Sequence, residues 1–174
     1  KIELLRGSNS LAWGSDAIGG VLSISSDGQT GLRAGAEYGA HDTVSANLAL
    51  GTQGNNYGLS AQGGYVSSDG ISAFAGGAEP DGFRQWRIGA NGYVNLAEDL
   101  SANLTARYAD SRIDFDGYPA PAYVFADTPE YQTTRQASGR AGLDYDTGTF
   151  NLRGGLALSD TRRAYYDPTF GSAP

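Results

Sequence analysis

The sequence predicts an all-β protein whose strands form a membrane-spanning, antiparallel up-and-down sheet, the segment of a β-barrel. Seven segments alternate apolar and polar residues with the period of two that a pleated strand imposes. Their apolar faces carry no charge, whereas their polar faces carry charges in mid-strand. The composition, with 26 Gly, 11 Tyr, no Cys and no Met in 174 residues, is also unlike that of a helical or α/β core.

The first three predicted strands are separated by short connections. In "LRAGAEYGA" (32–40), Leu32 and Tyr38 lie on the apolar face, and Arg33 and Glu37 lie on the polar one. "VSANLALG" (44–51) and "YGLSAQGGY" (57–65) repeat the pattern with smaller polar residues. The alternation therefore predicts one sheet with two faces of opposite character.

Four further strands follow. They are "WRIGANGYVNL" (86–96), "LSANLTARY" (100–108), "ASGRAGLDY" (137–145) and "FNLRGGLAL" (150–158). The fifth strand alternates most regularly, with Leu100, Leu104 and Tyr108 opposite Asn103 and Arg107. We therefore expect about seven strands.

The position of the charges favours a membrane barrel over a soluble sandwich or jelly roll, which would alternate too. An unpaired charge in the dry core of a sandwich costs several kcal/mol, whereas the wet lumen of a barrel tolerates it. Aromatic residues lie toward the strand ends, as in the girdle of an outer-membrane barrel. The mid-strand charges are Arg33, Glu37, Arg87, Arg107, Arg140, Asp144 and Arg153, and the aromatic residues are Tyr38, Tyr57, Tyr65, Trp86, Tyr108, Tyr145 and Phe150.

The connections alternate in length, which predicts an orientation. Those at Gly54, Glu98 and Asp146 are short, whereas 67–85, 111–134 and the chain from Asp160 are long. Long loops are extracellular in outer-membrane barrels. The connection at His41 is an exception, because it is short on the long-loop side.

The start of the chain carries the most specific motif. "IELLRGSNSLAWGSDAIGGVLSI" (2–24) resembles the end of the plug domain of TonB-dependent outer-membrane receptors, although Ser8 stands where the family usually has proline, and Leu22 and Ser23 where Ile or Asn is more usual. The resemblance implies a plug end at 1–28, followed by a barrel part at 29–174 in a barrel of 22 strands.

The loop motifs "SSDGISAF", "EPDGF", "FDGYPAP" and "ADTPEY" are similar to those of the cobalamin transporter branch of this family. The resemblance implies a receptor in the outer membrane of a Gram-negative bacterium, in contact with its lipid, that takes up cobalamin with energy from the inner-membrane TonB complex. A siderophore receptor shares the plug motif and stays an alternative. A passive porin fits the architecture less well, because it would have no plug sequence.

Other function classes find little support in the composition. A net charge of -7 argues against a nucleic-acid partner, since phosphate binding relies on clustered Lys and Arg. The single histidine, His41, lies in a tight turn, so the residues of a Ser/His triad or a histidine metal site are missing. We therefore expect neither an enzyme nor a catalytic cofactor.

Two of the long loops carry an acidic-x-Asp-Gly motif, at Glu79–Gly82 and Asp114–Gly117. Crowded carboxylates suit Ca²⁺, which takes six to eight oxygen ligands, although Asp-Gly also marks ordinary solvated turns. The resemblance implies loop-ordering Ca²⁺ ligands at Asp69, Glu79, Asp81, Asp116 and Asp127. It also implies that Phe115 and Tyr118 contact the ligand.

Glu3 and Arg6 lie at a strand end that the resemblance places inside the lumen. A desolvated charge there needs a partner. We expect Arg6 to meet an inward carboxylate of the barrel, either Glu37 or Asp144, with Glu3 as the local rival. These four residues are the predicted contact between plug and barrel.

Overall fold

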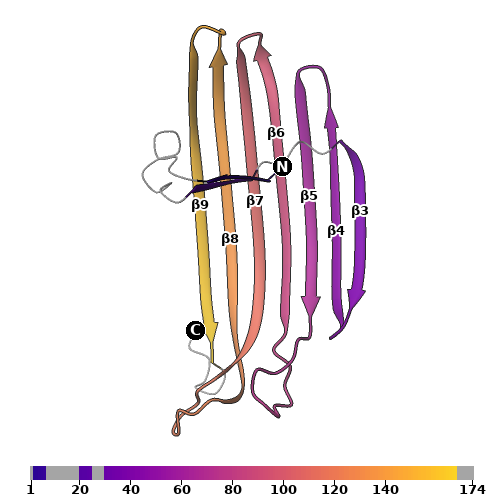
Figure 1. The fold of residues 1–174 in the computed structure, drawn as a ribbon, viewed down its shortest axis with the longest axis vertical. Coiled ribbons are helices and arrows are strands. Elements are labelled where there is room, and N and C mark those ends of the chain that lie inside the picture. The colour runs from indigo at the N-terminus through magenta and orange to yellow at the C-terminus, as the bar shows by residue number, and fades with distance from the viewer. Residues whose placement is uncertain (1, 7–19, 25–29, 168–174) are drawn as a thin grey trace.

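The computed structural model describes residues 2–6, 20–24 and 30–167, and this part of the chain is all-β. Seven strands form one antiparallel sheet in sequence order, β3-β4-β5-β6-β7-β8-β9, and the hairpin β1-β2 forms a separate two-stranded sheet (Figure 1). Neighbours in sequence are neighbours in the sheet, so the topology is up-and-down, as in a barrel segment. The described residues include no helix that is long and apolar enough to cross a membrane.

The strands of the large sheet lengthen from β3 to β8, and β9 is shorter again. Their bounds are β1 Ile2–Arg6, β2 Gly20–Ile24, β3 Gly31–Gly39, β4 Thr43–Gln53, β5 Tyr57–Ser68, β6 Phe83–Ala97, β7 Leu100–Gly117, β8 Ala126–Asp146 and β9 Asn151–Tyr166. All seven strands predicted from the alternation are present, in the predicted order. The prediction of one antiparallel sheet is confirmed.

The strand register places the residues of the apolar face next to one another across the sheet, and likewise those of the polar face. Leu32 pairs with Leu50 and Leu50 with Ala61 on one face, while Arg33 pairs with Ala49 and Ala49 with Gln62 on the other. Because a one-residue slip would exchange the faces, this register keeps the apolar set together. We call the apolar face outward and the polar face inward.

The outward face stays exposed, and the sheet has no dry core of its own. Leu156 and Leu158 on β9 are 78% and 79% exposed, and no large side chain of the described residues is fully buried. An apolar face of this extent is typical of a surface that packs against lipid rather than water.

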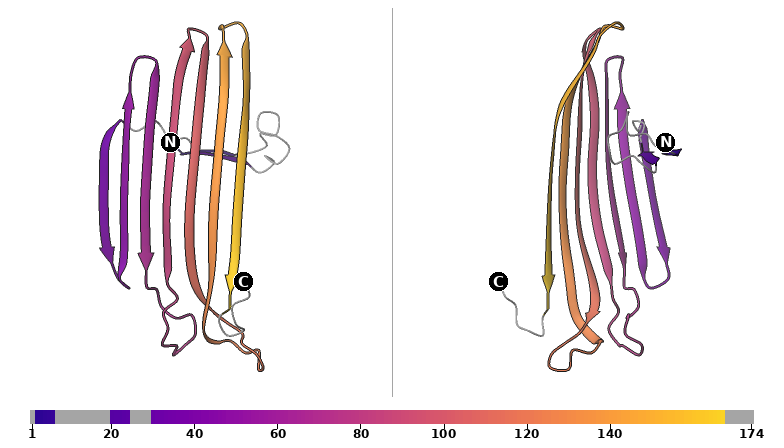
Figure 2. Two further views of the ribbon diagram at one scale, coloured as in Figure 1. Left: turned by 180° about the vertical axis from the view of Figure 1, so that it is seen from behind. Right: turned by 60° about the vertical axis from the view of Figure 1, so that its left-hand side comes forward.

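The connections between strands gather by length at the two ends of the sheet. The loops 69–82 and 118–125 lie at one end, which we call the loop end, together with the turn at 40–42 (Figures 1 and 2). That turn is short, as expected, because His41 and Asp42 both have positive φ, the type I′ conformation that suits a tight hairpin. It contacts the first loop, because Asp69 N donates to His41 O at 2.9 Å.

The prediction of a long loop at 111–134 was wrong in extent. Pairing between β7 and β8 continues from Ser111↔Thr134 to Phe115↔Glu130, so only 118–125 is loop. A register shift between Phe115 and Gly117 interrupts the ladder, whose last pair is Gly117↔Ala126. The polar composition of this stretch suggested a loop, but its alternation supports a strand that continues past the apolar face.

The two-stranded sheet contains both ends of the plug-like motif. Glu3 pairs with Ser23 and Arg6 with Gly20 through the backbone. The side chains of Glu3 and Arg6, and the knuckle residues Trp13, Gly14 and Gly19, lie outside the described residues. The division at residue 28 and the plug contact through Arg6 stay predictions.

Candidate functional site

The two loops at the loop end pack against each other through aromatic rings. Phe74 of the first loop lies edge-on to Phe125 of the second at 5.9 Å between ring centroids. Tyr118 packs on Phe125 at 5.4 Å and is 63% exposed. An exposed aromatic surface therefore lies where the two loops meet.

Asp116, next to the last residue of β7, ties the loops together. Its side chain accepts hydrogen bonds from Phe74 N at 2.7 Å and Ser72 Oγ at 3.2 Å, and from Thr128 N at 3.1 Å. Thr128 is 4% exposed and Asp116 9%. Buried carboxylates persist only when they are hydrogen-bonded, and these bonds hold the first loop onto the start of β8.

Two further carboxylates bind the same stretch of the first loop. Asp81 Oδ2 accepts from Ala73 N at 2.6 Å, and Asp127 Oδ2 accepts from Ala78 N at 2.8 Å. We call Asp81, Asp116 and Asp127 the loop clamp. Together they satisfy three backbone donors of a loop that has no ladder partner.

Glycines allow the close approaches around the loop clamp. At Gly70, φ is +72°, and a Cβ would overlap Asp81 O. At Gly117, a Cβ would overlap Glu130 Oε1, and Gly117 N donates to Thr128 Oγ1 at 2.7 Å. A larger residue at Gly70 would displace the backbone that carries Asp81, whereas at Gly117 it would displace the Glu130 side chain.

The carboxylates at the loop end perturb one another. Partial desolvation raises the pKa of Glu79, and the charges of Asp127, Asp114, Asp81 and Asp116 raise it further. These groups lie close enough to repel. A cation would relieve that repulsion.

Within the clamp, the pKa values of Asp81 and Asp116 move in opposite directions. Desolvation and the neighbouring Asp116 raise the pKa of Asp81 against the opposing hydrogen bond from Ala73. Burial alone would raise the pKa of Asp116, but its hydrogen bonds from Thr128, Phe74 and Ser72 outweigh burial and lower it. Asp116 therefore keeps its charge, and Asp81 takes up a proton more readily than Asp116 does.

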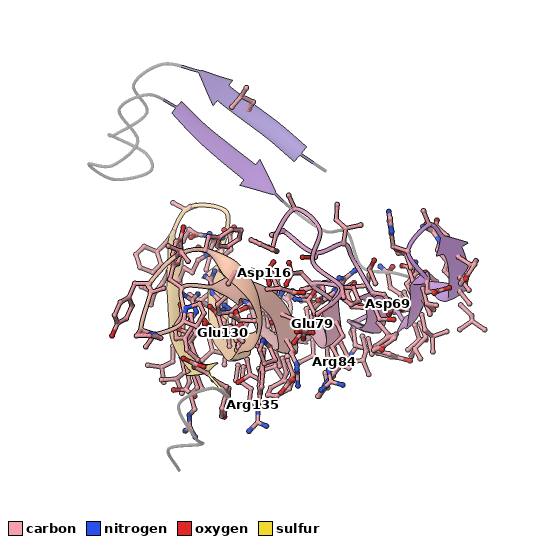
Figure 3. The ribbon with its side chains drawn as sticks, turned by 90° about the horizontal axis from the view of Figure 1, so that it is seen from below. Asp69, Glu79, Arg84, Asp116, Glu130 and Arg135 are labelled. Carbon is pink, nitrogen blue, oxygen red and sulfur yellow. The ribbon has the colours of Figure 1, made fainter. Side chains whose placement is uncertain are left out.

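The structure brings together four of the five predicted Ca²⁺ ligands. Glu79, Asp81, Asp116 and Asp127 interact with one another, whereas Asp69 lies toward β3 and β4 (Figure 3). Within the described ranges, no three acidic or histidine side chains already form a metal-binding group. Asp127 Oδ1 is nevertheless buried without a hydrogen-bond partner. A buried oxygen of this kind suits a hard cation.

The two aromatic residues predicted to contact the ligand, Phe115 and Tyr118, lie in different surroundings. Tyr118 belongs to the aromatic surface, but Phe115 lies within the ladder opposite Glu130. The sequence reasoning missed Phe74 and Phe125, which supply the ring contacts to Tyr118 and to each other. The available signal was that Phe74 and Phe125 lie in the two loops that flank the acidic motifs.

The predicted barrel partners of the plug have different surroundings. Asp144 on β8 accepts hydrogen bonds from Arg153, with which it forms an ion pair, and from Asn103 at 2.8 Å. Glu37 on β3 lies opposite Ser45 and has no ion pair within the described part of the chain. Of the two, Glu37 is the carboxylate left for a partner on the inward face.

The comparisons with known proteins agree with this architecture. The chain is 30% identical over 132 residues to the vitamin B12 transporter BtuB of Photobacterium profundum. The match covers 70% of this chain, and the chain spans about a fifth, 21%, of that relative's length. No family profile matches the chain. The likeness to a transporter supports the resemblance that the plug and loop motifs indicated.

Proposed function

We propose that the protein is a TonB-dependent outer-membrane receptor that takes up cobalamin. The observation that carries the proposal is the loop clamp, which presents an exposed aromatic surface beside crowded carboxylates at one end of a barrel sheet. The likeness to a vitamin B12 transporter supports the choice of ligand. The plug-like motif at 2–24 supports active uptake through the inner-membrane TonB complex over passive diffusion.

In this proposal the ligand binds at the loop end, which faces the outside of the cell. Flat aromatic rings such as Tyr118 and Phe125 offer apolar contact to a large planar ring system. Ligand affinity then depends on how firmly the loops are held. The clamp holds them through backbone amides, so it acts as a positioning device for the aromatic surface.

The proposal includes a calcium ion bound by the carboxylates at the loop end. Glu79, Asp81, Asp116 and Asp127 would hold it, with the buried Asp127 Oδ1 as a ready ligand. The ion would neutralise carboxylates that otherwise repel and would draw Glu79 toward the clamp. Asp69 would have to move toward this group to contribute.

The test is equilibrium binding of cobalamin to the full-length protein, with calcium and then with a chelator. We expect saturable binding that weakens at least tenfold on chelation, because mutual repulsion then loosens the loops. A ferric siderophore should neither bind nor compete. Binding of the siderophore without cobalamin would assign the protein to the siderophore receptors instead, and equal cobalamin affinity in both conditions would remove the calcium claim.

A further inference from the structure

The inward face of the sheet carries arginines that have no carboxylate beside them. Arg33 on β3, Arg87 on β6 and Arg107 on β7 are exposed, and none of them forms an ion pair within the described ranges. In the same part of the chain, their side chains make a single hydrogen bond, a long one of 3.5 Å from Arg87 Nη1 to Gln85 Oε1. This area of the inward face is therefore cationic, although the chain as a whole has a net charge of -7.

The strand register places these three arginines around one groove. One row of directly opposed residues crosses the sheet from β3 to β7 and consists of Arg33, Ala49, Gln62, Gly89 and Arg107. Neighbouring strands lie about 4.8 Å apart, so the two arginines at the ends of this row are about 19 Å apart along the backbone. Arg87 is the next inward residue of β6 toward the loop end. The groove between them has a volume of about 660 Å³, and all three arginines line it.

Glycines on the neighbouring strands keep this groove open. Each lies directly opposite a long polar side chain: Gly35 opposite Asn47, Gly64 opposite Arg87, and Gly89 opposite Gln62. A Cβ at Gly64 would lie 3.3 Å from Arg87 Nε, and a Cβ at Gly35 would lie 2.9 Å from Asn47 Oδ1. The polar side chains therefore lie along the sheet, over the glycines, and their guanidinium and amide groups line the wall without filling the space in front of it.

The groove lies on the way from the loop end to the opposite end of the sheet. Arg87 follows Phe83, the first residue of β6, by four residues, which places it about 13 Å along the strand from the loop end. A second groove, of about 520 Å³, continues from Arg107 away from the loop end, and Asn91 and Thr105 are among the polar residues that line it. A ligand released from the loops would meet the arginines first and the amide and hydroxyl groups next.

The chemistry of the first groove suits a ligand that carries a phosphate group and amides. A guanidinium group binds phosphate oxygens through two parallel hydrogen bonds, and amide side chains such as Gln62 and Gln136 both donate and accept. Cobalamin, the proposed ligand, carries a phosphodiester and amide side chains around its ring. Its charge is complementary to the arginines, and its amides match the remaining groups of the wall.

We propose that this groove, with Arg87 and Arg107 beside it, is a transit subsite that binds the phosphodiester of the ligand after the ligand leaves the loop end. The inference rests on the proposed function and adds a second site to it. Charge complementarity selects this occupant, because cations that are enclosed in a filled lumen without an anion are costly.

The test compares equilibrium binding and cellular uptake of cobalamin by the full-length protein. The variant is Arg87→Gln/Arg107→Gln. Its matched control, Arg84→Gln/Arg162→Gln, removes two arginines from the outward face of β6 and β9, and the ion pair that it breaks, between Arg162 and Asp160, is exposed and weak. A third variant, Arg87→Lys/Arg107→Lys, retains the charge. The second ligand is a corrinoid that lacks the phosphodiester.

We expect the Gln variant to bind cobalamin with the affinity of the parent, because the loop end is unchanged. At saturating ligand it should take up cobalamin roughly fivefold more slowly, because charge-assisted hydrogen bonds to the phosphodiester are lost. The control and the Lys variant should take up cobalamin nearly as fast as the parent. All four proteins should take up the corrinoid without the phosphodiester at similar rates.

Unchanged cobalamin uptake by the Gln variant overturns the proposal, as does a Lys variant that is as slow as the Gln variant. An equal loss for both corrinoids also overturns it, since the arginines would then hold another part of the protein, such as the plug, and not the ligand. A parent that binds no cobalamin contradicts the proposed function, and the transit subsite fails with it. Normal binding with unchanged uptake removes the transit subsite alone.

Discussion

Replacing Asp116 with alanine tests whether the loop clamp controls the loops. The substitution removes three hydrogen bonds, from Phe74 N, Ser72 Oγ and Thr128 N, that converge on a carboxylate only 9% exposed. Hydrogen bonds to a charged group contribute about 1.5 to 3 kcal/mol each in favourable cases. Water can enter the space that alanine leaves, so we take about 1 kcal/mol for each bond and expect the closed loop to lose about 3 kcal/mol.

Hydrogen exchange of the full-length protein measures this loss at the amides concerned. A change of about 3 kcal/mol corresponds to exchange roughly a hundredfold faster at Phe74 and Thr128 in the Asp116→Ala variant. Asp99→Ala, which removes an exposed carboxylate from the turn between β6 and β7, is the control and should leave both amides protected. Unchanged protection at Phe74 in the Asp116 variant would show that the remaining carboxylates and the aromatic contacts hold the loop without Asp116, and the central role given to Asp116 would be refuted.

Three further predictions address the same end of the molecule and the inward face. Gly70→Ala should disorder the first loop and weaken ligand binding at least tenfold, because its Cβ would overlap Asp81 O at a positive φ; wild-type affinity would exclude this. Without calcium, the loops should gain protection from hydrogen exchange as the pH is lowered from neutrality toward the ordinary carboxyl range, because the raised pKa values of Glu79 and Asp81 make their charged forms costly and protonation relieves that cost; loss of protection on this acidification would contradict the assigned shifts. Asp144→Asn should lower the free energy of unfolding by about 1 kcal/mol or less in denaturant titrations, because the Arg153 side chain is 68% exposed; a loss several times larger would reveal a partner beyond Arg153 and Asn103.

The sheet could be predicted from the sequence because its signal is local and repeated. Each strand carries its own period-two pattern, and short connections such as the one at His41 force neighbours in sequence to pair. The extent of β7 and β8 could not be predicted in the same way. Past Tyr108 the outward residues change from apolar to charged, which resembles a loop by composition although the ladder continues.

The candidate site was predictable in its residue types but not in its contacts. Spacing identified Glu79, Asp81 and Asp116, whose mutual proximity the structure supports. What binds each carboxylate depends on backbone donors of a loop with no periodic pattern, so the bonds to Ala73 and Phe74 had no sequence signal. The aromatic partner Phe125 likewise depends on how the second loop folds back.

Uptake of labelled cobalamin by cells that produce the full-length protein tests the central claim most directly. We expect accumulation that requires both an intact TonB complex and an energised inner membrane. The Asp116→Ala variant should accumulate less at low ligand concentration, because its loops are looser. Accumulation that proceeds equally without TonB would indicate passive diffusion through the barrel. No binding or uptake of cobalamin at all, with uptake of a different ligand in its place, would contradict the proposed substrate.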